Sequence, residues 1–195
     1  MQKIIYNGII EQIYRGKYNE RLRKKIMVIL GVDPGLATVG VGVLKFDKNR
    51  FTTIYYDAII TQPKIPIPER LQMIYDGLTQ IINTYNPTDM ALEELFYNTN
   101  QKTIIAVGEA RGVILLAAQK NGLDIDEYTP LQVKQSVVGY GRAEKIQVMT
   151  MVKNILRLDK IPKPDDVADA LAVAICHAHS KTANMIFRKN ILKLK

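Results

Sequence analysis

Four acidic residues stand where the surrounding sequence is apolar. Asp33 ends the run MVILGVD, Glu93 lies in the run MALEEL, and Asp166 and Asp169 open a segment that continues ALAVA. The spacing of Asp166 and Asp169 puts both side chains on one face of a helix. Ionised carboxylates are costly in apolar surroundings unless they are paired or hold a cation. These residues therefore indicate a cation site, if folding brings them together.

Each carboxylate also has an ordinary structural interpretation. Asp33 precedes a Pro-Gly pair, and taken alone it is more typical of a turn residue. Glu93 and Glu94 point to opposite faces of a strand, so they could pair with surface lysines. Asp165 and Asp166 follow a proline and could cap a helix and complement its dipole, which for these two alone is about as well supported as a functional role.

Taken together, the carboxylates favour a metal site over separate structural roles. Three or four carboxylates at one edge of a sheet repel each other strongly unless a cation neutralises them. Sites made only of oxygen ligands favour Mg²⁺ or Mn²⁺ over zinc. Two such ions close together can bind the attacking and leaving oxygens of a phosphodiester. The pattern therefore predicts metal-dependent phosphodiester chemistry.

A mixed α/β sheet would position these residues. The run 27–33 is rich in β-branched residues and ends at Pro-Gly, which predicts a strand buried on both faces. Residues 38–46 and 51–60 are predicted as hairpin partners of this strand. Further strands are expected at 89–95 and 124–128, and helices at 69–85, 103–120, 130–137, 143–157 and 165–179. Ligands bind at the carboxyl ends of strands in such sheets, where Asp33 is expected.

The helix predicted over 103–120 is apolar on almost every side. Its apolar residues include Ile104, Ile105, Val107, Val113, Ile114, Leu115 and Leu116. A helix of this kind is buried on more than one side. We expect one side to cover the sheet and the other to meet a second subunit.

The composition fits one globular domain. The chain has 195 residues, of which 47% are hydrophobic and 24% charged, enough for a substantial core. Its single cysteine, Cys176, excludes an internal disulfide framework and suits a reducing cytoplasm. No apolar run approaches the roughly 20 residues of a membrane span, and the N-terminus lacks the features of a signal peptide. We expect a cytoplasmic protein without membrane contact.

The net charge of +8 comes from the two ends of the chain. Residues 1–26 carry seven basic and two acidic residues (+5), residues 181–195 carry five basic and none acidic (+5), and residues 27–180 carry 15 basic and 17 acidic (−2). We expect a basic N-terminal extension over 1–26, a domain over 27–180 and a basic tail over 181–195. Met27 is itself a plausible start, and we slightly favour upstream sequence over an amphipathic helix for 1–26. Phosphate binding must come from local clusters or from the ends.

At this point the residues match a family. From about Met27 to Ser180 the chain resembles the RuvC family of bacterial Holliday-junction resolvases, nucleases of the RNase H-like superfamily. Six blocks in the family's order carry the resemblance, and they span residues 29–35, 91–96, 108–113, 133–139, 143–148 and 166–172. The resemblance implies an RNase H-like mixed β-sheet, with three antiparallel N-terminal strands and then parallel strands, flanked by α-helices.

The resemblance also implies an activity and its residues. Asp33, Glu93, Asp166 and Asp169 match the family's acidic tetrad, which holds two Mg²⁺ ions, with Mn²⁺ as an alternative; some members have His at the position of Asp166. Five further residues match DNA contacts of the family: Phe96, Asn100, Lys134, Arg142 and Lys145. The implied activity is resolution of four-way junction DNA by a homodimer through paired nicks, in homologous recombination and DNA repair. The branch-migration proteins RuvA and RuvB are the implied partners.

The chain departs from the family pattern at a few positions, and three other interpretations compete. Glu109 stands where Gln is usual, Glu94 where a neutral residue is common, and residues 1–26 are foreign to the family. An ATPase of the actin/Hsp70 kind would need a duplicated domain, for which the chain has no room. An RNA-processing nuclease of the YqgF type lacks the blocks at 133–139 and 143–148. A catalytically inactive junction-binding module is disfavoured, because all four carboxylates are present.

Overall fold

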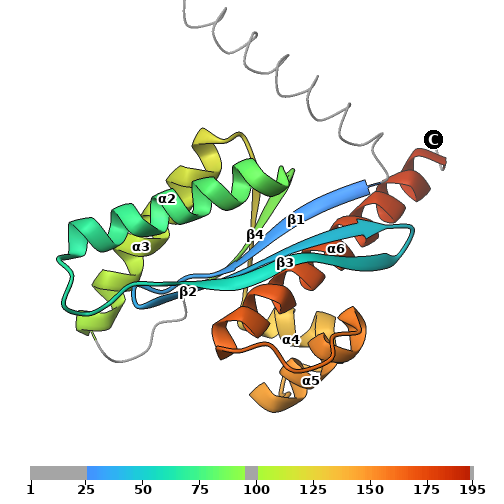
Figure 1. Ribbon diagram of the computed structural model, residues 1–195. Helices are drawn as coiled ribbons and strands as arrows, with labels where there is room; N and C mark the ends of the chain where they lie inside the picture. Colours follow the sequence, from blue (N-terminus) through green and yellow to red (C-terminus); the bar gives the residue numbers. More distant parts are fainter. Residues whose placement is uncertain (1–25, 95–100, 194–195) are drawn as a thin grey trace, which may run out of the picture.

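The fold is a five-stranded mixed sheet between two layers of helices (Figure 1). The computed structural model describes residues 26–94 and 101–193, with side-chain surroundings for 26–94 and 104–184. The strands are β1 (Ile26–Asp33), β2 (Thr38–Asp47), β3 (Arg50–Ile60), β4 (Asp89–Glu93) and β5 (Asp124–Tyr128). The helices are α2 (Ile67–Tyr85), α3 (Gln101–Lys120), α4 (Pro130–Val138), α5 (Lys145–Leu156) and α6 (Asp165–Lys193).

The strand order is β3-β2-β1-β4-β5. The first three strands pair antiparallel, whereas β4 pairs parallel with both β1 and β5. The predicted RNase H-like mixed sheet is therefore confirmed. β1 lies at the centre of the sheet, and its residues from Ile29 to Val32 are buried on both faces, as expected of a continuous apolar strand.

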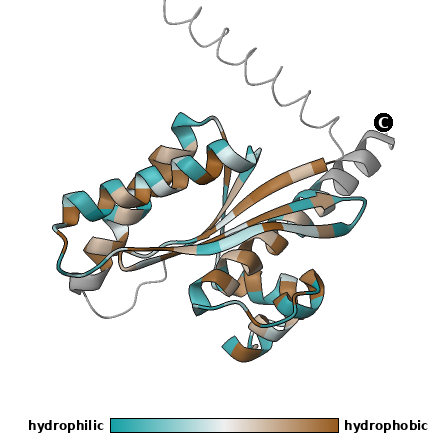
Figure 2. Ribbon diagram, in the orientation of Figure 1, coloured by the Kyte–Doolittle hydropathy of each residue, from teal (hydrophilic) through white to brown (hydrophobic). Residues whose placement is uncertain are grey.

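Side chains of each strand alternate between two cores. In β1 and β4, Ile29 and Ala91 contribute to the core shared with α4, α5 and α6, whereas Leu30 and Leu92 contribute to the core shared with α2 and α3. This alternation follows from the two-residue period of a strand. In Figure 2, α2 shows hydrophobic and hydrophilic residues alternating along its length, as expected of a helix that buries one face on the sheet.

Two glycines allow α6 to lie directly on the sheet. A Cβ atom at Gly31 of β1 would overlap the backbone carbonyl of Ala170, and one at Gly40 of β2 would overlap that of Asp166. Any larger residue at either position would push the first turns of α6 away from the strands. The close approach therefore fixes where the acidic start of α6 lies relative to β1.

All the predicted elements are present, but several of their boundaries differ by a few residues or more, and three are informative. α6 continues to Lys193, well beyond the expected end at 179, because residues 180–193 contain neither Gly nor Pro to stop the helix. β4 ends at Glu93, two residues earlier than expected. α2 begins at Ile67 and places Pro68 in its first turn, where proline is well tolerated.

Among the described residues, no helix is both long and apolar enough to cross a membrane.

Candidate active site

Asp33 and Glu93 end neighbouring parallel strands. Val32 of β1 pairs with Leu92 of β4, and the two acidic residues follow directly. Since Ile29 and Ala91 face α6, the two-residue period puts Asp33 and Glu93 on the same face. Glu94, the alternative carboxylate in the sequence, lies beyond the strand, where its backbone N–H donates to the Tyr128 carbonyl.

The first turns of α6 bring Asp166 and Asp169 to the same place. Gly40, which packs against the Asp166 carbonyl, is the strand partner of Asp33. The charges of Glu93, Asp169 and Asp166 all act on Asp33. The structure therefore assembles the four predicted carboxylates from two strands and one helix.

Burial and mutual repulsion make these carboxylates hard to ionise. Burial, followed by the charges of Glu93, Asp169 and Asp166, raises the pKa of Asp33 from 3.8 to about 8. Burial and the charge of Asp169 raise the pKa of Glu93 from 4.5 to about 7. Burial also raises the pKa of Asp169, although its hydrogen bond with Lys145 opposes the change. The site thus carries more negative charge than its surroundings compensate, and a bound cation would stabilise the ionised form.

Of the two predicted lysines, Lys145 contacts the carboxylates and Lys134 lies within electrostatic reach of them. Lys145, the first residue of α5, places Nζ 3.0 Å from Asp169 Oδ2 and 3.7 Å from Asp165 Oδ2. Partial burial opposes the charge of Lys145, but the hydrogen bond to Asp169 and the nearby carboxylates outweigh it and raise the lysine pKa. The pKa of Glu93 is raised overall, and the charge of Lys134 of α4 opposes that rise in part, so Lys134 lies within electrostatic reach of this carboxylate. Lys145 is therefore close enough to meet a phosphate bound at the carboxylates, and Lys134 adds positive charge nearby.

The four carboxylates have the right chemistry to bind divalent cations, but in the structure they are not grouped tightly enough to hold one. Four carboxylates offer the oxygen ligands that Mg²⁺ prefers, and no cysteine or histidine joins Asp33, Glu93, Asp166 and Asp169 in the described part of the site. In the arrangement seen, no three His, Cys, Asp or Glu side chains of the described residues are grouped tightly enough to hold a metal ion. Lys145 instead neutralises part of the charge, through Asp169. The carboxylate side chains would have to move closer together to form a metal site.

The remaining predicted contacts are less well placed. Arg142 lies on the exposed loop between α4 and α5, and it makes no hydrogen bond or ion pair with another described residue. Phe96 and Asn100 lie outside the described residues. Asp165 forms an ion pair with Lys163 at 2.7 Å, so its interpretation as a purely structural residue of the helix start agrees with its contacts.

Arg111 of α3 holds the end of β4, a role that the sequence patterns did not single out. Its Nη1 donates a hydrogen bond to the Glu93 backbone carbonyl at 3.0 Å, and its Nη2 pairs with Glu127 Oε2 at 2.5 Å. The side chain is only 15% exposed. A lone arginine in a largely apolar helix was the available signal, because a buried guanidinium requires partners.

The strand order and the carboxylates at the ends of β1 and β4 define a protein of the RNase H-like class. The family model described as "Crossover junction endodeoxyribonuclease RuvC" matches residues 29–177. The chain therefore belongs to the RuvC family.

Curated relatives and solved structures agree with this assignment. The crossover junction endodeoxyribonuclease RuvC of Alkaliphilus oremlandii is 57% identical over 162 residues, which cover 83% of this chain and 99% of the relative. That of Caldanaerobacter subterraneus subsp. tengcongensis is 58% identical over 162 residues, covering 83% and 97%. Thermus thermophilus RuvC, solved in complex with a Holliday junction substrate, superposes with a TM-score of 0.78 at 34% identity, covering 82% of this chain and 97% of that one.

Proposed function

We propose that this chain is a structure-specific DNA endonuclease that resolves Holliday junctions by paired, metal-dependent nicks, in homologous recombination and DNA repair. The convergence of Asp33, Glu93, Asp166 and Asp169 in a member of the RuvC family carries the proposal. The solved relative with a Holliday junction substrate supports four-way junction DNA as the substrate.

The four carboxylates are the proposed ligands of two Mg²⁺ ions, with Mn²⁺ as a substitute. When bound, these cations would supply the Lewis acidity for in-line hydrolysis of a phosphodiester. Asp33, whose charge interacts with Glu93 on the next strand and with both aspartates of α6, would hold the cations together with these residues. The raised pKa values of Asp33 and Glu93 support this assignment, because they mark a place where the protein concentrates negative charge without compensating it.

The lysines and neighbouring residues act on the DNA. Lys145 and Lys134 offset negative charge on the phosphate that is being cleaved. Lys145 must exchange its ion pair with Asp169 for the phosphate, which frees Asp169 to bind a cation. Arg142 is proposed to contact the DNA backbone from the exposed loop. Phe96 and Asn100 are the proposed base-stacking and sequence-reading residues, in line with the stacking of bases on aromatic rings elsewhere.

The exposed face of α3 is the proposed dimer interface. Ile105 and Leu116 are 66% and 53% exposed, and a Cβ added at Gly108 or Gly112, between them on the helix, would meet no atom within 4 Å. An apolar face with small residues at its centre suits close packing against the same face of a second copy around a two-fold axis. A dimer would place one site on each of two like strands of the junction. RuvA and RuvB are the proposed branch-migration partners.

Cleavage of a synthetic mobile four-way junction in Mg²⁺ tests the function. The unaltered chain should make symmetric nicks in the junction and leave a linear duplex and a structured RNA of matched length intact. Asp33→Asn, Glu93→Gln and Asp169→Asn should abolish nicking but leave junction binding largely intact. Full activity in any of the three would remove that residue from the site. Preference for RNA would instead support an RNA-processing enzyme.

Sedimentation at micromolar concentration tests the interface on α3. The unaltered chain should sediment as a dimer, and Leu116→Glu should shift it to a monomer by burying a charge in the apolar contact. The variant should still bind the junction but lose coordinated nicking of both strands. A strict monomer on junction DNA would refute the dimer.

A further inference from the structure

A second group of basic side chains lies at the end of the sheet remote from the carboxylates. β2 starts beside Asp33, through its pair with Gly40, and runs away to the hairpin turn at Lys48-Asn49. Beside this turn is a hollow of about 520 Å³ between the hairpin, the end of α5 and α6. Its lining residues are Asn49, Arg50, Phe51, Ile155, Arg157 and His179, none of them acidic.

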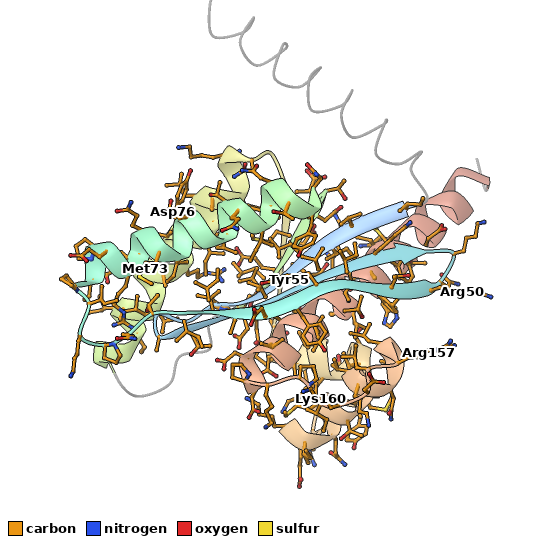
Figure 3. The ribbon with its side chains drawn as sticks, in the orientation of Figure 1. Arg50, Tyr55, Met73, Asp76, Arg157 and Lys160 are labelled. Carbon is orange, nitrogen blue, oxygen red and sulfur yellow. The ribbon has the colours of Figure 1, made fainter. Side chains whose placement is uncertain are left out.

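The two arginines of the hollow, Arg50 and Arg157, form no ion pair with another described residue. Asp47 is the cross-strand partner of Arg50 but does not pair with its guanidinium, and it does not line the hollow. Figure 3 shows the two arginine side chains extending from the hairpin and from the end of α5 on the same side of the molecule. His179 lines the hollow too; its Nδ1 lies 3.1 Å from Ser136 Oγ, and its ring meets Phe51 edge-on. Two guanidinium groups without an ion pair, beside His179 and Asn49, form a place for an anion, and guanidinium suits phosphate oxygens.

A basic surface connects this hollow to the carboxylates. Residues 130–157, which form α4, α5 and their connection, contain five basic residues and one acidic residue. Lys145 opens α5 at the carboxylates, and Arg157 follows its last residue. Arg157 lies twelve residues after Lys145, which corresponds to about 18 Å along the helix axis. That distance corresponds to about five base pairs of duplex DNA.

We propose that Arg50 and Arg157 bind the phosphate backbone of the junction arm that is being cut, about five base pairs from the cleaved bond. The inference rests on the proposed function and adds a second, remote contact on the same arm. DNA is favoured over an acidic protein because α5 leads from the carboxylates to the hollow without an acidic residue. Residues 27–180 have a net charge of −2, and this contact explains how they can still bind a polyanion through a local cluster of basic side chains.

Junctions with arms of two lengths test the contact. Arms of 20 base pairs reach the hollow, whereas arms of four base pairs, closed by loops for stability, do not. Arg50→Gln and Arg157→Gln should each weaken binding of long-arm junctions several-fold and reduce the slope of log K against log salt by about one, and by about two when combined. Short-arm junctions should bind the variants as tightly as the unaltered chain. Lys120→Gln, on the opposite helical layer, is the control and should change neither.

The outcomes separate the two proposals. Weaker binding of long arms with unchanged turnover at saturation supports the contact. If the variants lose binding affinity equally for both arm lengths, the arginines have a structural role. If they lose no affinity for long-arm junctions, the hollow binds something other than DNA, such as an acidic protein. Either result overturns the inference. The proposed function fails instead if the unaltered chain cleaves neither junction, and the arm-length comparison by binding alone then still decides the contact. Matching denaturant transitions for all variants establish that they fold.

Discussion

Replacement of Asp33 by Asn should stabilise the metal-free protein while it removes cleavage. The pKa of Asp33 is raised in the folded chain from 3.8 to about 8, by burial first and then by the charges of Glu93, Asp169 and Asp166. The folded state therefore holds a proton on Asp33 that the unfolded state has already lost. The contribution of this group is fully present below its unfolded pKa and is lost as the pH rises through the folded pKa. Stability of the metal-free chain should fall between about pH 4 and pH 8.

The pKa difference sets the magnitude. At pH 9 ionised Asp33 costs the folded state at most about 6 kcal/mol, and at pH 5 the uptake of a proton by Asp33 on folding costs about 2 kcal/mol. Asn lacks the charge, so the stability gained by Asp33→Asn should grow between these pH values by up to about 4 kcal/mol. Because local relaxation lowers the cost of a buried charge, we expect a growth of at least about 2 kcal/mol.

Urea unfolding at pH 5, 7 and 9 with EDTA measures this growth. Asp76→Asn, on the exposed face of α2, is the matched control and should leave the pH dependence unchanged. Addition of Mg²⁺ at pH 9 should stabilise the unaltered chain much more than the Asp33→Asn variant. A stability difference that stays constant from pH 5 to pH 9 would refute the electrostatic account of the site, even if the variant is inactive.

Three further predictions follow from the same contacts. Mg²⁺ binding should release roughly one proton from Asp33 and Glu93 together at pH 7 but far less at pH 9, measured by calorimetry in buffers of different ionisation enthalpy. Equal proton release at both pH values would contradict the pKa assignments. Gly31→Ala should destabilise the fold by about 1–3 kcal/mol, because its Cβ would displace α6, and chemical denaturation should show it. Arg111→Ala should lower stability by about 2 kcal/mol and weaken Mg²⁺ binding, because it releases the end of β4; unchanged Mg²⁺ affinity would make Arg111 purely structural.

Much of the fold was predictable because its signals are local. The period of two in residues 38–46, the period of 3.6 in residues 69–85 and the Pro-Gly pair after Asp33 each reflect the backbone preferences of a few neighbouring residues. The family resemblance then supplied the strand pairing that such local signals lack. The end of α6 was missed because basic composition suggested a solvated tail, whereas helix formation is limited by Gly and Pro, which are absent from residues 180–193.

The sequence by itself determined that a carboxylate would end a buried strand and that two more would share one face of a helix. Its local pattern did not determine whether Glu93 or Glu94 faces the site, since an isolated strand can present either residue on a given face, and only the family resemblance favoured Glu93. The pairing of β4 with β1 gives the physical reason, because it aligns Glu93 with Asp33 on the face that α6 covers. Two further contacts join residues far apart in the chain: the ion pair between Lys145 and Asp169, and the hydrogen bond from Arg111 to the Glu93 carbonyl. Such contacts depend on long-range packing, which no local pattern encodes.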